Sequence, residues 1–320
     1  MDPVCHTLTG LAMGQAGLKR RTPLALVTLA LAANAPDIDI AVLATDTLQV
    51  SFRRGWTHGP PAMVLLPLAL TALVVGYDRL VRQRRVPAPP PVVPTQLLWL
   101  AALGTWSHPL LDYMNSYGIR LLMPFSGRWF YGDALYIVDP WMYLLLGAGV
   151  VWAWRARGSA SGLPSTLPSG QRAARAGLAA AAGYVALMYA SNVWARAEVQ
   201  AGLTRAGQSA APFMVTPVAG NPFRREVIVD LGERYEKGFL AFSPQPHFRP
   251  AGYGVTKNHD HPAARAAAAT ARGRQYLDWS RFPFFVVAST ATGQTVTIND
   301  ARYSGPSGNQ GWAGIVVAVP

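Results

Sequence analysis

Long apolar runs separated by short basic loops dominate the first two thirds of the chain. Residues 3–18 form a short run, and the longer runs cover residues 22–44, 60–77, 97–113, 134–154 and 176–194. A membrane-spanning helix needs about 20 apolar residues. The pattern predicts a helical membrane domain in which residues 3–18 are a short or re-entrant helix.

After residue 195 the pattern changes to short alternating or β-rich runs separated by Gly, Pro and Asn. These runs cover residues 213–218, 226–231, 238–242, 284–290, 295–300 and 314–319. Alternation with period two between turn residues predicts an antiparallel β-rich module. Residues 263–276 are expected to form a helix.

Composition supports a membrane protein. The chain is 51% hydrophobic and 14% charged, whereas a soluble domain carries about 25% charged residues. The formal net charge of +12 is concentrated beside the apolar runs, and no aromatic-interleaved basic patch is present. This distribution argues against nucleic-acid binding. Cys5 is the only cysteine, so no intramolecular disulfide can form. Lys19–Arg21 follow the first apolar run, which argues against a cleavable signal peptide.

The loop charges predict an orientation. Loops 19–21, 78–96 and 155–175 carry eleven Lys and Arg, and loops 45–60 and 114–133 carry two each. The positive-inside rule therefore places the first set in the cytoplasm and the β-rich module outside.

The predicted fold class is mainly α, a polytopic α-helical membrane domain with a smaller extracytoplasmic β-rich C-terminal domain. The expected parts are a helical membrane domain with the metal site at 1–158, a cytoplasmic linker at 159–175, a transmembrane helix at 176–194 and the β-rich domain at 195–320. The expected location is the cell (inner) membrane, and the sequence leaves the oligomeric state open.

Acidic and imidazole side chains gather near the predicted outer ends of the membrane segments. They are His6, Asp37, Asp39, His58, His108 and Asp112. Ionisable residues inside a membrane are costly and by default mark function. Clustered carboxylates repel one another unless protonated or neutralised by a cation. Three His with several Asp suit a divalent transition metal, Zn²⁺ first, with Mn²⁺ or Fe²⁺ as alternatives.

His108 and Asp112 stand four residues apart, hence on one helix face. The alternative to ligation is a buried His–Asp hydrogen bond that fixes packing. The ligand supply exceeds the need of one tetrahedral ion, so a two-metal site with an activated water is a further option. Asp39 and Asp112 are the predicted catalytic residues, as general base or as groups that orient a ligand. Arg54 and Arg120 are expected to bind a substrate phosphate, or else to snorkel at the interface.

Three other candidates are weaker. Asp139 precedes Pro140 and fits a helix N-cap. His259-Asp260-His261 fits a solvated turn of the β-rich domain. Cys5 fits a small apolar residue.

With those residues in view, the first part of the chain resembles the membrane-bound metal-dependent hydrolase family of YdjM and YfhP type. The shared elements are an early His6 with Gly10, P-D-I-D (Pro36–Asp39), R-G-W-T-H (Arg54–His58), S-H-P-L-L-D (Ser107–Asp112), G-I-R-L-L-M-P-F-S (Gly118–Ser126) and I-V-D-P (Ile137–Pro140). Two segments of the tail resemble the longer YfhP-like members, namely W-S-R-F-P-F-F (Trp279–Phe285) and N-D-A-R-Y (Asn299–Tyr303).

The resemblance implies a hydrolase with a divalent metal in a largely helical membrane domain. One departure concerns the ligand count. Many relatives read H-R-G-x-T-H-S, whereas this chain has Arg53 in place of the first His and Gly59 in place of the Ser. If that His is a ligand elsewhere, this chain has one fewer.

The predicted function is therefore a metal-dependent membrane hydrolase acting on an ester or phosphoester of a lipid or envelope substrate. The alternative is a transporter that moves an ion through the same His and Asp cluster, and a third reading is a structural or sensory membrane protein. Confinement of the ionisable groups to one layer favours the enzyme, because an ion path needs polar groups through the full membrane depth.

Overall fold

The chain forms two compact units. The computed structural model describes residues 1–156, 169–242, 247–290, 293–305 and 313–319. The first unit, here called the helical unit, comprises Met1–Asp39 and Arg54–Tyr189. The second, here called the β unit, comprises Ile40–Arg53 and Ala190–Pro320.

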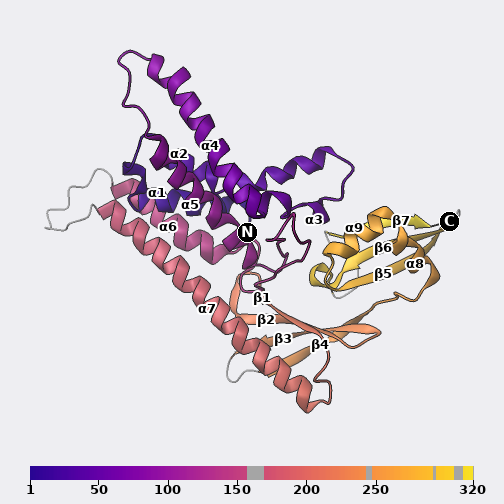
Figure 1. Cartoon of the computed structure of the whole chain (residues 1–320). Coiled ribbons are helices and arrows are strands. Elements are labelled where there is room, and N and C mark those ends of the chain that lie inside the picture. Colours follow the sequence, from indigo (N-terminus) through magenta and orange to yellow (C-terminus); the bar gives the residue numbers. More distant parts are fainter. Residues whose placement is uncertain (157–168, 243–246, 291–292, 306–312, 320) are drawn as a thin grey trace. The chain divides into compact units, whose positions relative to one another are not determined.

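Most helices of the helical unit begin at a proline, which fits the first turn because its missing N–H would have no partner there. The α-helices that lie in or start in this unit are α1 (Pro3–Gln15), α2 (Ala25–Ala32), α4 (Pro60–Leu80), α5 (Pro94–Tyr113), α6 (Pro140–Arg155) and α7 (Ser169–Arg205) (Figure 1). Shorter 3₁₀ segments are η1 (Leu18–Arg20), η2 (Ala35–Ala44), η3 (Trp56–His58) and η4 (Arg82–Arg84). Helix α7 begins inside the range expected to be a linker, whose residues 159–168 lie outside the described part of the chain.

The prediction of a polytopic helical domain is wrong. Within the described residues two helical segments, Pro60–Arg84 and Gly170–Arg205, are long and apolar enough to cross a membrane. Helix α2 and η2 together would make a third, but the pair is bent by 51°. Helix α6 has 16 residues, whereas a span needs about 20. Helix α5 has 20 residues, but polar side chains such as His108 and Asp112 interrupt its apolar run.

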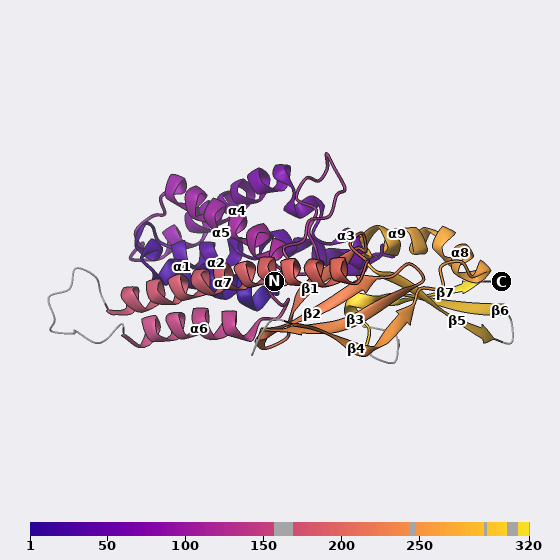
Figure 2. The same cartoon turned by 90° about the horizontal axis from the view of Figure 1, so that it is seen from below.

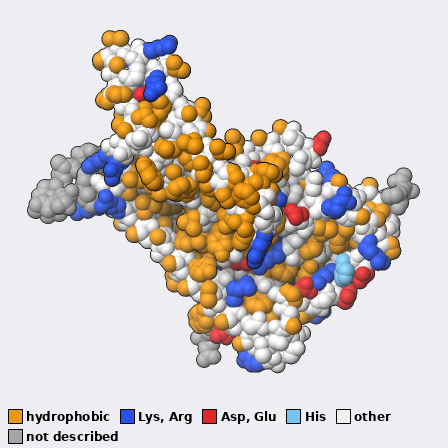
Figure 3. Space-filling model, in the orientation of Figure 1, with side chains coloured by type: hydrophobic (Ala, Val, Ile, Leu, Met, Phe, Trp, Pro, Cys, Tyr) orange, Lys and Arg blue, Asp and Glu red, His pale blue; other side chains and the backbone are white. Residues whose placement is uncertain are grey.

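The helical unit buries polar groups and exposes apolar ones. His6, His108 and Asp112 are fully buried, whereas Leu73 and Trp152 are 71% and 68% exposed. Figure 3 shows hydrophobic side chains over much of the visible face of this unit. Large exposed apolar surfaces are unusual in soluble monomers and mark contact with a partner or a membrane. The exterior therefore suits hydrocarbon better than water.

Glycines allow the helices that carry the cluster to approach closely. A Cβ atom on Gly10 of α1 would lie 2.5 Å from the carbonyl oxygen of Leu29 in α2, and one on Gly104 of α5 would lie 2.7 Å from Cβ of Ala32. Helix α2 is thus packed tightly against both α1 and α5. This packing brings the histidines of α1 and α5 into one buried space.

Helices α6 and α7 lie side by side in Figures 1 and 2. A Cβ atom on Gly149 of α6 would lie 3.1 Å from Cα of Gly177 in α7, and one on Gly170 would lie 2.7 Å from the carbonyl oxygen of Ala153. Small residues at facing positions permit such close backbone contact between helices.

The β unit contains two antiparallel sheets. The first has the order β1 (Phe213–Val218), β2 (Asn221–Asp230), β3 (Arg234–Ala241) and β4 (His247–Thr256), and the second has β5 (Pro283–Thr290), β6 (Gly293–Asp300) and β7 (Ile315–Val319). Helices α3 (Gln49–Phe52), α8 (Pro262–Ala269) and α9 (Ala271–Trp279) belong to the same unit. All six predicted β-rich runs contain observed strands, and β4 was not expected.

The last turns of α7 form part of the β-unit core. Ala195, Val199 and Leu203 repeat every four residues and are buried against a cluster that includes Val215 of β1 and Val227 of β2. The two valines face each other across the β1–β2 ladder. Burial of this stripe explains why the helix continues past the predicted end of the span at residue 194.

A buried carboxylate ties the turn after α9 to the end of β6. Asp300 accepts hydrogen bonds from Ser280 Oγ at 2.6 Å and from the backbone N–H of Arg281 at 2.8 Å. Its other oxygen lies 3.0 Å from Arg302 Nε. Burial alone would raise the pKa of Asp300, but the Arg302 charge and these hydrogen bonds hold it below its ordinary value. Residues of Trp279–Phe285 and of Asn299–Tyr303 therefore meet at one buried ionic contact.

Replacing Asp300 by Asn should destabilise the β unit by about 3–5 kcal/mol, because Arg302 would keep a buried charge without its partner. The measurement is thermal unfolding of the detergent-solubilised protein followed by near-UV circular dichroism. Because the folded pKa of Asp300 is lowered, its contribution is fully present above about pH 4 and is lost as the pH falls further.

The matched control is Asp260→Asn, since the side chain of Asp260 is 73% exposed. Equal unfolding temperatures for the two variants would contradict a structural role for Asp300.

Candidate metal centre

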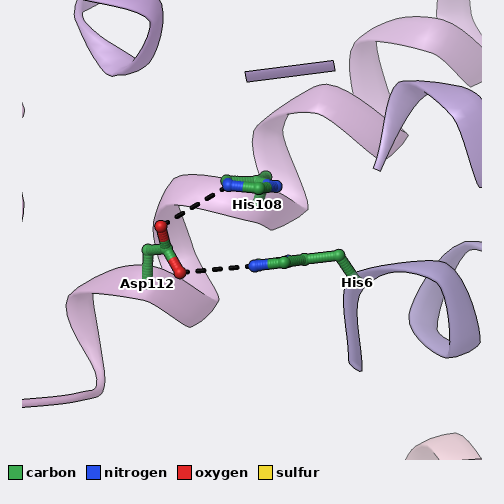
Figure 4. A group of neighbouring side chains, drawn as sticks. All are labelled: His6, His108 and Asp112. Atoms are coloured by element: carbon green, nitrogen blue, oxygen red, sulfur yellow. Dashed lines mark hydrogen bonds and ion pairs between the residues drawn. The ribbon is translucent and has the colours of Figure 1, made fainter. Parts of the chain in front are cut away.

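Two helices bring the first three residues of the cluster together. His6 extends from α1, and His108 and Asp112 lie one turn apart on α5 (Figure 4). His6 Nε2 lies 3.3 Å from Asp112 Oδ1, and His108 Nε2 lies 3.5 Å from Asp112 Oδ2. The two imidazole rings stack with centroids 3.6 Å apart and an interplanar angle of 13°. All three side chains are fully buried.

His58, in η3, approaches Asp112 from a third segment. Its Nε2 atom lies 3.5 Å from Asp112 Oδ2, and its ring is 5.0 Å from that of His108, centroid to centroid. Asp112 therefore has an imidazole nitrogen of each of three histidines within 3.5 Å. Residues 6, 58 and 108 are far apart in sequence, so this convergence depends on the fold.

The backbone orients the His108 ring. His108 Nδ1 lies 2.7 Å from the carbonyl oxygen of Ala33, which can only accept a hydrogen bond. The proton therefore resides on Nδ1, and the lone pair of Nε2 points into the cluster. A hydrogen bond of this kind behind the ligating nitrogen is typical of metal-bound histidines.

Thr57 and Asp39 orient the His58 ring in a similar way. His58 Nδ1 lies 2.9 Å from Thr57 Oγ1, and that hydroxyl donates to Asp39 Oδ2 at 3.3 Å. Asp39 also accepts the backbone N–H of Arg54 at 2.7 Å. Asp39 thus lies on the Nδ1 side of His58, opposite Asp112. This position suits a group that orients a ligand better than a ligand itself.

Asp37 extends the cluster on the side of His108. Its Oδ1 atom lies 3.8 Å from His108 Nε2. Asp37, His58 and His108 form one potential ligand group, and His6, His108 and Asp112 form another, with donor atoms within 4.8 Å of one another in each. Both groups use His108, so they are halves of one site.

Burial keeps His6 and His58 in the ligating form. It lowers the pKa of His6 to about 3, with a further lowering by neighbouring His108. Burial likewise lowers the pKa of His58. Neutral imidazole is the form that binds metals.

Arg54, predicted to hold substrate, is occupied by protein groups. Its Nε lies 2.9 Å from Asp112 Oδ2, and its two terminal nitrogens donate to Asn115 Oδ1 at 2.9 Å and to the carbonyl oxygen of Met1 at 3.0 Å. The guanidinium also lies over the Tyr117 ring, 4.6 Å from its centroid. Arg54 therefore compensates the charge of Asp112, which the amine of Met1 also contacts.

Arg120 lies against the loop that carries Arg54. Its guanidinium is 4.9 Å from the centroid of the Trp129 ring, and its backbone N–H donates to the carbonyl oxygen of Arg54 at 2.8 Å. A Cβ atom on Gly55 would lie 2.7 Å from the Arg120 guanidinium. Its predicted role in substrate binding stays a prediction.

Gly59 is required by close packing. A Cβ atom at this position would lie 1.9 Å from the carbonyl oxygen of Met123. A serine at this position would therefore force the loop to shift. Gly59 is also the N-cap of α4, and no side chain caps that helix. The hydroxyl of nearby Thr57 contacts His58 Nδ1 instead of capping α4.

The weaker candidates have other surroundings. Asp139 caps α6 by accepting the N–H groups of Trp141 and Met142. His259 and Asp260 are exposed in the β unit, and Cys5 is buried among apolar side chains. Sequence reasoning missed Asn115, which accepts a hydrogen bond from Arg54, although its place three residues after Asp112, just past the end of α5, was a usable signal.

Comparison with known proteins gives one match. A family model described as YdjM inner membrane protein matches residues 1–198, which include α1 to α6, most of α7 and every residue of the cluster. No curated protein and no solved structure gives a significant match.

Replacing Thr57 by Val should weaken metal binding about 10–100-fold, because the His58 ring loses the hydroxyl that connects it to Asp39. Competition with a chromogenic chelator measures the zinc affinity of the purified protein. Thr71→Val is the control, since the Thr71 hydroxyl bonds only to the α4 backbone. Equal affinities for both variants would contradict an orienting role for Thr57.

Proposed function

The chain belongs to the YdjM inner membrane protein family, and we propose that it is a membrane hydrolase whose activity depends on a divalent metal held by the His and Asp cluster. Inner-membrane association follows from the family, and the two candidate spans agree with it. The hydrolytic activity and the metal are the proposal.

The observation that carries the proposal is a pair of buried nitrogens. His58 Nε2 and His108 Nε2 are buried and make no hydrogen bond, although both point toward Asp112. Buried polar atoms without a partner are rare and need an explanation. A cation between these nitrogens and the carboxylate satisfies all of them together.

The donor set fits a transition metal. His6, His58 and His108 supply imidazole nitrogens, and Asp112 and Asp37 supply carboxylate oxygens. Three protein ligands drawn from His and carboxylate are typical of catalytic Zn²⁺, while Mn²⁺ and Fe²⁺ accept the same ligand types. Because His108 has one free lone pair and both ligand groups need it, a single ion fits better than two.

When bound, the ion would lower the pKa of a coordinated water to near neutrality and supply hydroxide. Asp112 and the histidines would hold the ion. Asp39 would keep the His58 ring aligned through Thr57. Asp37, whose side chain is 12% exposed while those of Asp112 and Asp39 are 0% and 1% exposed, would complete the donor set on the more exposed side of the cluster.

The surroundings of the cluster support a lipid or envelope precursor as the substrate class. The exterior of the helical unit is apolar, and the family resides in the inner membrane. An ester or phosphoester of a lipid or envelope precursor would reach such a site from the bilayer. Arg120 remains the candidate for holding a phosphate, since Arg54 is engaged with Asp112.

Metal analysis of the purified protein tests the proposal. Wild type should retain about one ion per chain, and His108→Ala and Asp37→Asn should retain far less, because each removes a donor. Asp46→Asn is the control, since Asp46 is exposed and belongs to none of the potential ligand groups found among the described residues. Unchanged metal content in both site variants would refute the site.

Activity is tested with a panel of lipid and phosphoester substrates. Hydrolysis should disappear with a chelator, return on addition of Zn²⁺ or Mn²⁺, and be absent in His108→Ala. Metal binding without hydrolysis of any substrate class in the panel would count against an enzyme and favour transport.

The basic residues beside the candidate spans support an external β unit. Arg82, Arg84 and Arg85 follow α4, and Arg172 and Arg175 lie in the first turns of α7. Both basic ends belong in the cytoplasm by the positive-inside rule. Helix α7 would then lead out of the cell interior, and the β unit would follow on the outer side.

Reporter fusions check this orientation. An alkaline phosphatase fused at the C-terminus should be active, and one fused after Gly158 should be inactive, because this enzyme folds only outside the cytoplasm. A cytoplasmic C-terminus would contradict the proposed orientation.

A further inference from the structure

A groove on the helical unit is lined by residues of η1 and of α5 and by Arg21, which follows η1. It has a volume of about 430 Å³, within the range of small-molecule sites. Its walls are apolar and include Leu18, Trp99, Leu103 and Trp106. Arg21 and Gln96 line the polar part, and we call the whole feature the α5 groove.

The length of the α5 groove matches one leaflet. Gln96, Trp99, Leu103 and Trp106 follow the three- and four-residue spacing of one helix stripe. Ten residues of helix between Gln96 and Trp106 rise about 15 Å. The hydrocarbon core of a bilayer is about 30 Å thick, so one leaflet contributes about half of this. An acyl chain fits this dimension.

The polar end carries positive charge without a counterion. Arg21 lines the groove and Arg20 is exposed beside it, and no acidic partner of either is found within the described part of the chain. The backbone N–H of Val93 donates to Thr22 Oγ1 at 2.8 Å, which holds Arg21 close to the start of α5.

The start of α5 adds a second attraction for anions. Val93 is the N-cap, and no side chain caps the helix. The first N–H groups of α5 therefore have no helical partner, and the helix dipole is positive there. A phosphate group is a good ligand for a helix N-terminus with an adjacent arginine.

We propose that the α5 groove binds an anionic phospholipid of the cytoplasmic leaflet, with its phosphate at Arg21 and the first turn of α5 and an acyl chain along Trp99, Leu103 and Trp106. Trp99 is 69% exposed and Leu103 is 42% exposed, so the chain covers apolar surface that the protein leaves open. Anionic lipids are concentrated in the cytoplasmic leaflet, and juxtamembrane basic residues attract them.

This lipid site does not depend on the proposed hydrolase. His108 and Asp112 lie on the buried face of α5, whereas Trp99, Leu103 and Trp106 lie on its exposed face. The phosphate end of the groove is at the opposite end of α5 from Asp112. The bound lipid is therefore a resident ligand and not the hydrolysed substrate.

Native mass spectrometry of the full-length protein in detergent with equimolar phosphatidylglycerol and phosphatidylcholine tests the proposal. Wild type should retain one phosphatidylglycerol in preference to phosphatidylcholine. Arg21→Gln should lower the phosphatidylglycerol affinity about fivefold, the effect of one basic residue near anionic lipid. Arg21→Lys keeps the charge and should retain most of the binding.

Arg84→Gln is the matched control, because Arg84 is an exposed arginine outside the groove and its loss changes the net charge equally. Trp99→Ala should lower retention of both lipids by removing part of the wall. Equal phosphatidylglycerol retention by wild type, Arg21→Gln and Arg84→Gln would overturn the proposal, as would equal retention of the two lipids by wild type. Metal content is measured on the same samples and should stay unchanged, which separates this outcome from a failure of the metal site.

Discussion

The carboxylate of Asp112 is the constraint around which the helical unit is arranged. A fully buried carboxylate is tolerated only when hydrogen bonds and opposite charges compensate its lost hydration. Arg54 supplies a guanidinium at 2.9 Å, and imidazole nitrogens of His6, His58 and His108 lie at 3.3 to 3.5 Å. These partners come from α1, the loop around η3 and α5. Satisfying one carboxylate therefore fixes how three segments meet.

A further layer of contacts fixes the orientation of these partners. The carbonyl oxygen of Ala33 sets the tautomer of His108, and Thr57 with Asp39 aligns His58. Asn115 and the ring of Tyr117 hold Arg54. Each of these groups lies behind a residue of the cluster, and the Nε2 lone pairs of His58 and His108 are thereby directed inward. A site arranged in this way is preorganised for a cation.

The apolar exterior and the polar interior have one cause. Hydrocarbon offers no hydrogen bonds, so polar groups must find partners inside the protein while apolar groups face outward. Leu73, Trp99 and Trp152 follow this rule on the outside, and the cluster follows it within. The α5 groove belongs to the same exterior, where Arg21 provides the charged end that a lipid headgroup needs. The two sites thus use opposite faces of α5.

Sequence alone determined which chemical groups are present and the nature of the local elements. The spacing of His108 and Asp112 placed them on one helix face, the alternating runs predicted six of the seven strands, and the ordered motifs predicted the family over the first half of the chain. Each of these follows from local periodicity or residue order. The number of candidate spans did not follow, because polar residues of the cluster interrupt the apolar run of α5, and α6 has 16 residues, fewer than a span needs.

Only the tertiary structure decided the roles within the cluster. Asp37 and Asp39 are two residues apart, yet one faces His108 Nε2 and the other the Nδ1 side of His58. Arg54 looked like a free cation for substrate, yet it is paired with Asp112, 58 positions further along the chain by their numbering. Local pattern names the side chains that can bind. The direction in which each side chain points, and the group that it contacts, depend on the packing of segments far apart in sequence. No local spacing encodes that packing.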